Sequence, residues 1–167
     1  MRAIIEGILN KEIEENKVDI VLTGGLSYDF SRLKNIVSFI RKKFFHIKII
    51  VGGAIITADP GTAMIALEYA DIGVIGEGEI TVVELRGALQ KEMGVGVGVA
   101  GIIYMDNGDW VQSKPREEIN DLDSLPFPDY DGFGADRYLE LSFPPRPSVP
   151  AQKADASPKC WTALRKP

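Results

Sequence analysis

The sequence predicts an α/β fold with a mainly parallel sheet and flanking helices. Three short apolar runs, residues 18–22, 47–51 and 72–75, alternate with longer segments whose apolar residues recur at helical spacing. A turn with one or more glycines follows each run. Successive strand–helix units pair their strands in parallel, so these turns should share the carboxyl edge of one sheet. In open parallel sheets ligands bind at that edge, and a site is expected there.

Four segments have the spacing of amphipathic helices, with charged residues mostly on the opposite face. Asp59 suits the N-cap of the third helix and Pro60 its first position, where no N–H partner is needed. One helix is expected between the second and third strands. The expected helices span residues 2–16, about 29–44, from 60 onward, and about 79–92. The residues expected to face the core are Ile4, Ile5, Ile8, Leu9, Ile13, Phe30, Leu33, Ile36, Val37, Ile40, Phe44, Ala63, Met64, Leu67, Ile80, Val83, Leu85 and Leu89.

The pattern changes after residue 93. Residues 99–105 and 110–113 alternate around Asp106-Asn107-Gly108-Asp109, a strong β-hairpin signal that predicts added edge strands or a small extension. The expected organisation is a partial α/β domain over residues 1–93, a glycine-rich connection and hairpin over 94–114, an acidic, proline-punctuated linker over 115–141, and a disordered or non-homologous tail over 142–167.

Composition narrows the function classes. The chain has 167 residues and a net charge of −5, without a long basic run, which disfavours nucleic-acid binding. No apolar run approaches the roughly 20 residues of a membrane span, and acids near the N-terminus disfavour a secretory signal. Cys160 is the only cysteine, so neither an internal disulfide nor a multi-cysteine metal site is expected. The expected compartment is the cytoplasm.

The glycine turns admit two interpretations. Gly52-Gly53 either lets a ligand approach the backbone or simply makes a tight turn, and the spacing alone favours the turn. A similar turn, TGGLS at residues 23–27, follows the neighbouring strand and favours a shared groove. In that groove the hydroxyls of Thr23, Ser27 and Thr57 would be available to a ligand.

Other candidate residues carry weaker signals. Glu77 and Glu79 follow the third strand, where they either bind a ligand or compensate the dipole of the next helix. His46 precedes a strand at the opposite edge, which favours a surface or helix-end role and gives no convincing Ser–His–Asp arrangement. The sequence GEGEIT does not match GxGxxG, and no Walker pattern occurs.

Three motifs in order carry a family resemblance: VGG followed by a threonine, DIGVIGEGE followed by TVVEL, and DLDSLPFPDY. Over residues 18–133 the chain resembles the N-terminal cobalamin-binding region of cobalamin-dependent radical S-adenosylmethionine enzymes. The resemblance implies a flavodoxin-like (Rossmann-like) sheet that holds cobalamin at the carboxyl ends of its strands. It assigns to the cofactor Thr23, Gly24, Gly25, Leu26, Ser27, Gly52, Gly53, Ala54, Thr57, Gly76, Glu77, Gly78 and Glu79.

The chain departs from the family pattern in three ways. The usual first strand, which is central in that fold, has no counterpart, so the strand at 18–22 should be an open, apolar sheet edge. No D-x-H-x-x-G supplies a histidine to cobalt. A lone Cys160 cannot hold the iron–sulfur cluster, which together with S-adenosylmethionine belongs to the parent family only. We therefore expect a fragment truncated at both ends, for which an interrupted reading frame is one hypothesis.

The leading interpretation is a cobalamin-binding domain fragment of a methyltransferase-like radical enzyme, without catalysis of its own. Its partners would be a corrinoid and a radical-enzyme domain or a second copy. One alternative is a non-catalytic interaction module that associates through the open sheet edge. A third is a small-ligand receiver domain with flavodoxin-like topology.

Overall fold

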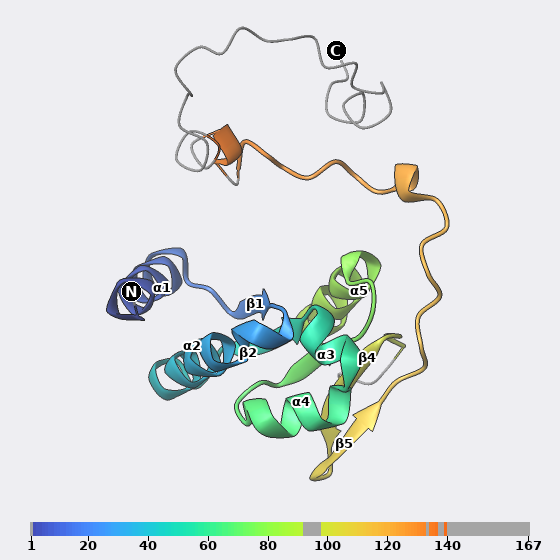
Figure 1. The fold of residues 1–167 in the computed structure, drawn as a ribbon, viewed down its shortest axis with the longest axis horizontal. Helices are drawn as coiled ribbons and strands as arrows, with labels where there is room; N and C mark the ends of the chain where they lie inside the picture. Colours follow the sequence, from blue (N-terminus) through green and yellow to red (C-terminus); the bar gives the residue numbers. More distant parts are fainter. Residues whose placement is uncertain (1, 92–97, 133, 137–138, 140–167) are drawn as a thin grey trace, which may run out of the picture. The chain divides into compact units, whose positions relative to one another are not determined.

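The computed structural model describes residues 2–91, 98–132, 134–136 and 139 (Figure 1). The chain divides into two compact units, residues 1–122 and 123–167. In the second unit a local turn forms, in which Ala135 donates its N–H to the carbonyl oxygen of Tyr130 at 3.0 Å. The expected tail over 142–167, with Cys160, lies outside the described residues, as does most of the glycine–valine connection.

The first unit contains a five-stranded sheet with the order β1-β2-β3-β4-β5. The pairs β1–β2 and β2–β3 are parallel, which confirms the α/β prediction. The predicted hairpin is present, and its first strand adds antiparallel to β3. The strands are β1 (Ile20–Gly24), β2 (Lys48–Gly52), β3 (Ile72–Val74), β4 (Ile102–Asp106) and β5 (Asp109–Gln112). The helices of this unit are α1 (Arg2–Asn16), α2 (Phe30–Lys43), α3 (Ala54–Ala58), α4 (Pro60–Leu67) and α5 (Glu79–Gln90), with a 3-10 turn at Ser27–Asp29.

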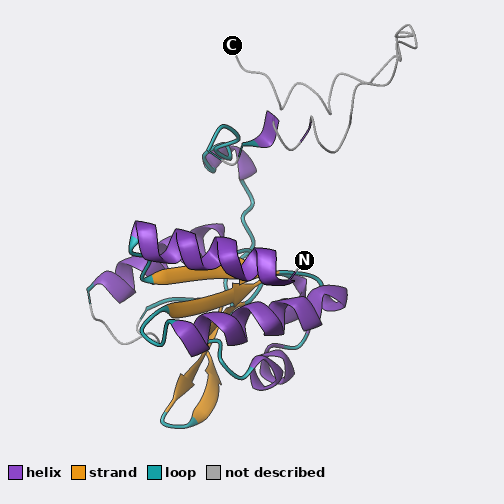
Figure 2. Cartoon of the chain, turned by 90° about the vertical axis from the view of Figure 1, so that its left-hand side faces the viewer, coloured by secondary structure: helices purple, strands orange, loops and turns teal. Residues whose placement is uncertain are grey.

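Helices cover both faces of the sheet (Figure 2). Because side chains alternate along a strand, Ile49 and Val51 pack with α1 to α4, whereas Ile50 packs with α5. The larger core lies on the side of α1 to α4 and the smaller one on the side of α5. None of the helices in the described part of the chain is long and apolar enough to cross a membrane.

The edge of the sheet at β1 is open in the described part of the chain. β1 pairs with β2 over its whole length, from Ile20 opposite Lys48 to Gly24 opposite Gly52, and no described strand lies on its other side. The core under α5 takes residues from β2, β3 and β4, but from β1 only Ile20 packs against it. Leu22 is consequently 54% exposed. The open apolar edge expected from the sequence is confirmed.

Two helices, α3 and α4, fill the interval where the sequence predicted one. The prediction of Asp59 as N-cap and Pro60 as first residue is correct for α4. The sequence did not reveal α3, which ends one residue before the cap. Asp59 separates the two helices because its backbone is extended (φ −153°, ψ 86°), and a residue before proline is restricted to such angles.

Strand limits also differ from the expected ones. β1 begins at Ile20 instead of Val18, because the chain is still leaving α1 there. The N–H of Val18 donates to the carbonyl oxygen of Ile13 at 3.2 Å, and Lys17 has a left-handed φ of 49°. The third strand ends at Val74, one position earlier than expected.

The buried face of α5 was predicted correctly at Leu85, which is buried, and at Leu89, which packs against the smaller core, but wrongly nearer the start of the helix. Ile80 and Val83, expected in the core, are 39% and 70% exposed. The buried residues are Thr81, Leu85 and Ala88. The hydroxyl of Thr81 makes hydrogen bonds to two main-chain carbonyl oxygens and to a distant arginine, which is described below. With Thr81 facing inward, Ile80 and Val83 face solvent.

In α1 the expected apolar stripe is buried only in its second half. Ile4 and Ile8 are 67% and 57% exposed, whereas Ile13 is buried and Leu9 packs against the larger core. An ion pair of 3.6 Å between Glu14 and Lys43 joins the same half of the helix to α2. The first half of α1 therefore meets little of the described core.

Candidate functional site

Two glycine turns meet at the carboxyl edge of the sheet. Gly24 and Gly52 form the last rung between β1 and β2. Just beyond it, Gly53 has a left-handed φ of 90°, and a Cβ there would lie 3.0 Å from the carbonyl oxygen of Gly25. That oxygen also accepts a hydrogen bond of 3.3 Å from the N–H of Ile55. Glycine is required here because the two turns approach each other backbone to backbone.

Thr57 joins the third turn to these two. Its hydroxyl accepts a hydrogen bond of 3.0 Å from the N–H of Gly76 and lies 3.2 Å from the carbonyl oxygen of Gly53. This hydroxyl, which the sequence suggested for a ligand, is thus engaged within the protein. Gly76 has a left-handed φ of 74°, and a Cβ there would meet no atom within 4 Å, so the space in front of this turn is open.

A cavity of about 420 Å³ lies beside the joined turns. Its volume is within the usual range of small-molecule sites, about 300 to 1,000 Å³. Of the residues expected from the sequence, five line the cavity: Gly53, Ala54, Thr57, Gly76 and Glu77. The turn at Thr23, Gly24, Gly25, Leu26 and Ser27 lies at the neighbouring strand end, with Gly52, and is outside the lining. Gly78 caps α5, and Glu79 is its exposed first residue.

The other wall of the cavity comes from residues 114–119, here called the strap. Arg116, Glu117 and Glu118 of the strap line the cavity together with Ile75. Sequence reasoning missed these residues because no spacing or periodicity connects the acidic, proline-containing segment to the strand ends. The contact between them exists only after folding.

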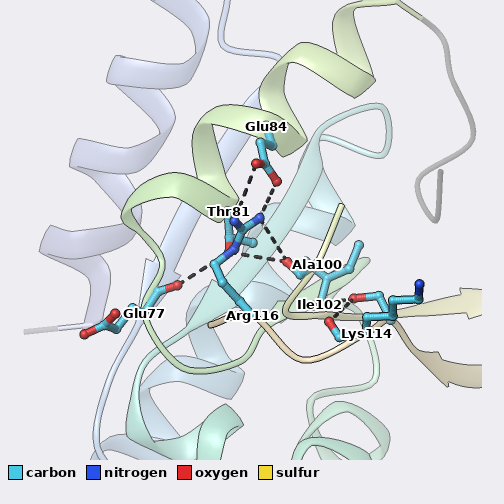
Figure 3. A network of polar contacts seen from close by, with 8 residues as sticks. Glu77, Thr81, Glu84, Ala100, Ile102, Lys114 and Arg116 are labelled. Atoms are coloured by element: carbon cyan, nitrogen blue, oxygen red, sulfur yellow. Dashed lines mark hydrogen bonds and ion pairs between the residues drawn. The ribbon is translucent and has the colours of Figure 1, made fainter. Parts of the chain in front are cut away.

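Arg116 fastens the strap to α5 (Figure 3). Its Nε donates to the hydroxyl of Thr81 at 2.6 Å, and its guanidinium pairs with Glu84 and reaches the carbonyl oxygen of Ala100 at 3.5 Å. The side chain of Arg116 is only 15% exposed, and Thr81 is fully buried. A planar guanidinium with several donors in fixed directions suits such a multiple contact better than an ammonium would.

Both ends of the strap are also held. At its start, the carbonyl oxygen of Lys114 accepts a hydrogen bond of 2.8 Å from the N–H of Gly101. Near its end, the N–H of Ile119 donates to a carboxylate oxygen of Glu77 at 2.6 Å. The sequence left open whether Glu77 binds a ligand or only belongs to the turn. In the structure its carboxylate holds the end of the strap.

The strap brings two acidic residues to the cavity, and their carboxylates have no partner among the described residues. Glu117 and Glu118 are exposed and line the cavity, and their side chains make no hydrogen bond or ion pair with the described residues. Over the same part of the chain, no group of three or more histidine, cysteine or acidic side chains could hold a metal ion. His46 is exposed in the turn before β2, in edge contact with the ring of Phe45, at the amino end of the strand. The site thus offers hydrogen-bonding groups and open backbone rather than metal ligands.

Comparison with known families identifies this arrangement. Residues 5–86, which contain the three glycine turns, match the family described as the B12 binding domain. Residues 5–86 form a B12-binding domain. The predicted resemblance is confirmed over this stretch, and β4, β5 and the strap come after it in the chain.

Longer proteins contain a similar domain. An uncharacterized methyltransferase of Pyrococcus horikoshii, PH0819, is 32% identical over 128 residues, which are 77% of this chain and 27% of that protein. The chain thus spans about a quarter of the length of this curated relative.

Solved structures show the same fold. The radical S-adenosylmethionine methyltransferase TsrM from Kitasatospora setae, with cobalamin and an iron–sulfur cluster bound, matches 72% of this chain with a TM-score of 0.59 at 17% identity. The cobalamin-dependent radical enzyme OxsB, with aqua-cobalamin and S-adenosylmethionine bound, matches 81% with a TM-score of 0.62 at 24% identity. The chain covers 23% and 19% of these two proteins. The B12-binding domain described here therefore has the α/β fold expected from its sequence.

Proposed function

We propose that this chain binds a corrinoid at the carboxyl edge of its sheet, between the joined glycine turns and the strap. The observation that carries the proposal is the contact of three glycine turns beside a cavity of about 420 Å³ within a B12-binding domain. The resemblance and the names of the similar proteins support cobalamin as the corrinoid. The turns at Thr23–Ser27 and at Gly78-Glu79, which flank the cavity, would extend the contact surface.

The chemistry of the lining suits such a ligand. A corrin ring carries amide side chains around its rim, which both donate and accept hydrogen bonds. Glycines at the strand ends leave backbone exposed for close approach, and Glu117 and Glu118 offer acceptors on the opposite wall. No described residue near the cavity is assigned as a cobalt ligand, since His46 lies at the other end of β2.

The proposed biological role is that of a corrinoid carrier within a methyltransferase-type assembly. When bound, the corrinoid supplies a cobalt centre that carries a methyl group. The chain would hold and orient it, and a radical S-adenosylmethionine domain would perform the chemistry. In this proposal residues 1–93 are the carrier domain, 94–114 are a glycine-rich connection and a hairpin extension, and 115–141 lead toward the catalytic partner.

A direct test mixes the purified chain with hydroxocobalamin, removes free ligand on a desalting column and records the visible spectrum. We expect a corrinoid band to travel with the protein. A protein fraction without that band, at ligand concentrations up to the millimolar range, would reject the proposal.

Two matched variants locate the site. Ala54 is exposed and lines the cavity, whereas Ala58, at the other end of α3, is exposed and does not. Filling the cavity with Ala54→Phe should weaken binding of hydroxocobalamin at least about tenfold, a loss of about 1.4 kcal/mol. Ala58→Phe should leave the affinity unchanged. Equal affinities for the two variants in a spectral titration would place the corrinoid elsewhere.

A second function is favoured by the open edge of β1. This strand offers unpaired backbone groups and the exposed side chain of Leu22, so we propose that two copies associate by pairing their β1 strands. Light scattering after size exclusion should show a dimer that Leu22→Lys dissociates. Ile65→Lys, at an even more exposed apolar residue of α4, is the control and should leave the dimer intact. A monomer at all concentrations would exclude this role.

A further inference from the structure

We infer that the strap selects corrinoids by their amide groups: Arg116 positions the wall of the cavity, and Glu117 and Glu118 accept hydrogen bonds from corrin amides. This inference rests on the proposed function and specifies which ligands the same site takes. The strap lies outside residues 5–86, so the match to the B12 binding domain does not include it.

The strap is held at three points, and its two unpaired carboxylates lie between the last two. The points are the carbonyl oxygen of Lys114, the guanidinium of Arg116 and the N–H of Ile119. Between Arg116 and Ile119 the main chain has little freedom, so Glu117 and Glu118 are kept at the cavity. The middle contact is the strongest of the three, since Arg116 pairs with Glu84 and also bonds the buried hydroxyl of Thr81.

Charge explains why these carboxylates would bind an amide in preference to a carboxylate. A carboxylate only accepts hydrogen bonds, and a primary amide offers two N–H donors to it. A corrinoid in which one amide is replaced by a carboxylate places a negative charge next to the negative charge of Glu117 or Glu118. Two like charges a few ångströms apart repel each other. Arg116 is the only cation among the described residues that line the cavity, and it is paired with Glu84. Lys114, at the start of the strap, is not part of the lining. The wall should therefore accept the amide form and reject the acid form.

The test compares cyanocobalamin with its three monocarboxylic acids, each made by hydrolysis of one propionamide and purified separately. Dissociation constants at pH 7 are measured by isothermal titration for the full chain and for the double variant Glu117→Gln/Glu118→Gln. For the wild-type chain, at least one acid should bind about tenfold or more weakly than cyanocobalamin. The ratio of the dissociation constant of that acid to that of cyanocobalamin should fall below about threefold in the double variant. The reason is that glutamine accepts and donates hydrogen bonds without a charge.

Arg116→Gln tests the positioning role. It should reduce the discrimination between amide and acid, as the double variant does, although it leaves both carboxylates in the sequence. Arg86→Gln is the matched control, since Arg86 is an exposed arginine of α5 outside the cavity lining. Its ratio should equal that of the wild type. A purely structural effect of Arg116→Gln would weaken all four ligands by the same factor and leave their ratio unchanged.

The outcomes separate the two proposals. If cyanocobalamin and hydroxocobalamin fail to bind the wild-type chain, the corrinoid function itself is wrong. If they bind, but all three acids bind as well as the amide form, or the ratio is the same in the wild type and in the Glu117→Gln/Glu118→Gln variant, the role of the strap is overturned and the corrinoid function stands.

Discussion

At the scale of single residues, glycines set how closely the elements of this domain approach one another. Gly53 lets two turns touch at the candidate site. Gly73, inside β3, has a different role, because a Cβ there would lie 2.6 Å from a methyl carbon of Ile103 and 2.9 Å from the sulfur of Met64. The helices α3 and α4 can lie directly on β3 only because this position has no side chain.

Gly73→Ala should therefore lower the free energy of unfolding by about 1 to 3 kcal/mol, the usual cost of overpacking a core. Gly87→Ala is the matched control. It lies within α5 and a Cβ there would meet no atom within 4 Å, so alanine should raise the stability by about 0.5 to 1 kcal/mol. Urea unfolding followed by circular dichroism measures both, and the same sign for the two variants would contradict the close packing of β3.

At the scale of elements, the start of α4 depends on one carboxylate. Asp59 accepts a hydrogen bond of 3.1 Å from the N–H of Thr62 and so satisfies a free donor of the first turn. Hydrogen bonds from the side chain and the backbone of Thr62 hold the pKa of Asp59 below its ordinary value. The part of the cap's stabilisation that comes from the charge is therefore present only while Asp59 is ionised.

Asp59→Ala should lower the thermal unfolding midpoint at pH 7, and the difference from the wild type should shrink in acid. Because the pKa is lowered on folding, the contribution is complete above the pKa of an unfolded aspartate, about 3.9, and is lost as the pH falls through the lower folded value. Scanning calorimetry between pH 7 and pH 2.5 measures this. Asp59→Asn, which keeps an acceptor without a charge, should show a smaller dependence on pH. A difference that stays constant down to the lowest pH would contradict the role of the charge.

At the scale of the whole molecule, the described core belongs to the first compact unit. Every residue of both core clusters lies between Leu9 and Trp110, and the strap completes the same unit, which ends at residue 122. The strap therefore behaves as part of the domain and not only as a connection to the second unit. Through its ion pair with Glu84, Arg116 connects the last part of the first unit's sequence to α5.

A chain of residues 1–122 should accordingly unfold at the same urea concentration as the chain of 167 residues. A chain that ends at residue 113 loses the contacts of Arg116 with Thr81 and Glu84 and should unfold at a lower concentration, with a loss of about 1.5 to 3 kcal/mol. If the chain ending at 122 were as unstable as the one ending at 113, residues beyond 122 would contribute to the core.

Much of the fold could be predicted from local patterns. Apolar runs ending in glycine located β1, β2 and β3 to within a few residues, and Asp106-Asn107-Gly108-Asp109 identified the hairpin, because turn residues and strand runs are local properties of the chain. On α5, the spacing correctly placed Leu85 and Leu89 against the core, but it misplaced the residues nearer the start of the helix. Ile80 and Val83 have the right spacing for a core, but Thr81 is fixed by Arg116, a residue far along the chain.

The sequence by itself determined that this protein has glycine turns along one edge of an α/β sheet, because apolar runs and turn residues are local properties of the chain. Only the tertiary structure decided which residues form the cavity. Three contacts depend on distances between segments remote in sequence: Gly25 with Gly53, Thr57 with Gly76, and Arg116 of the strap with Thr81. No spacing along the chain encodes those distances.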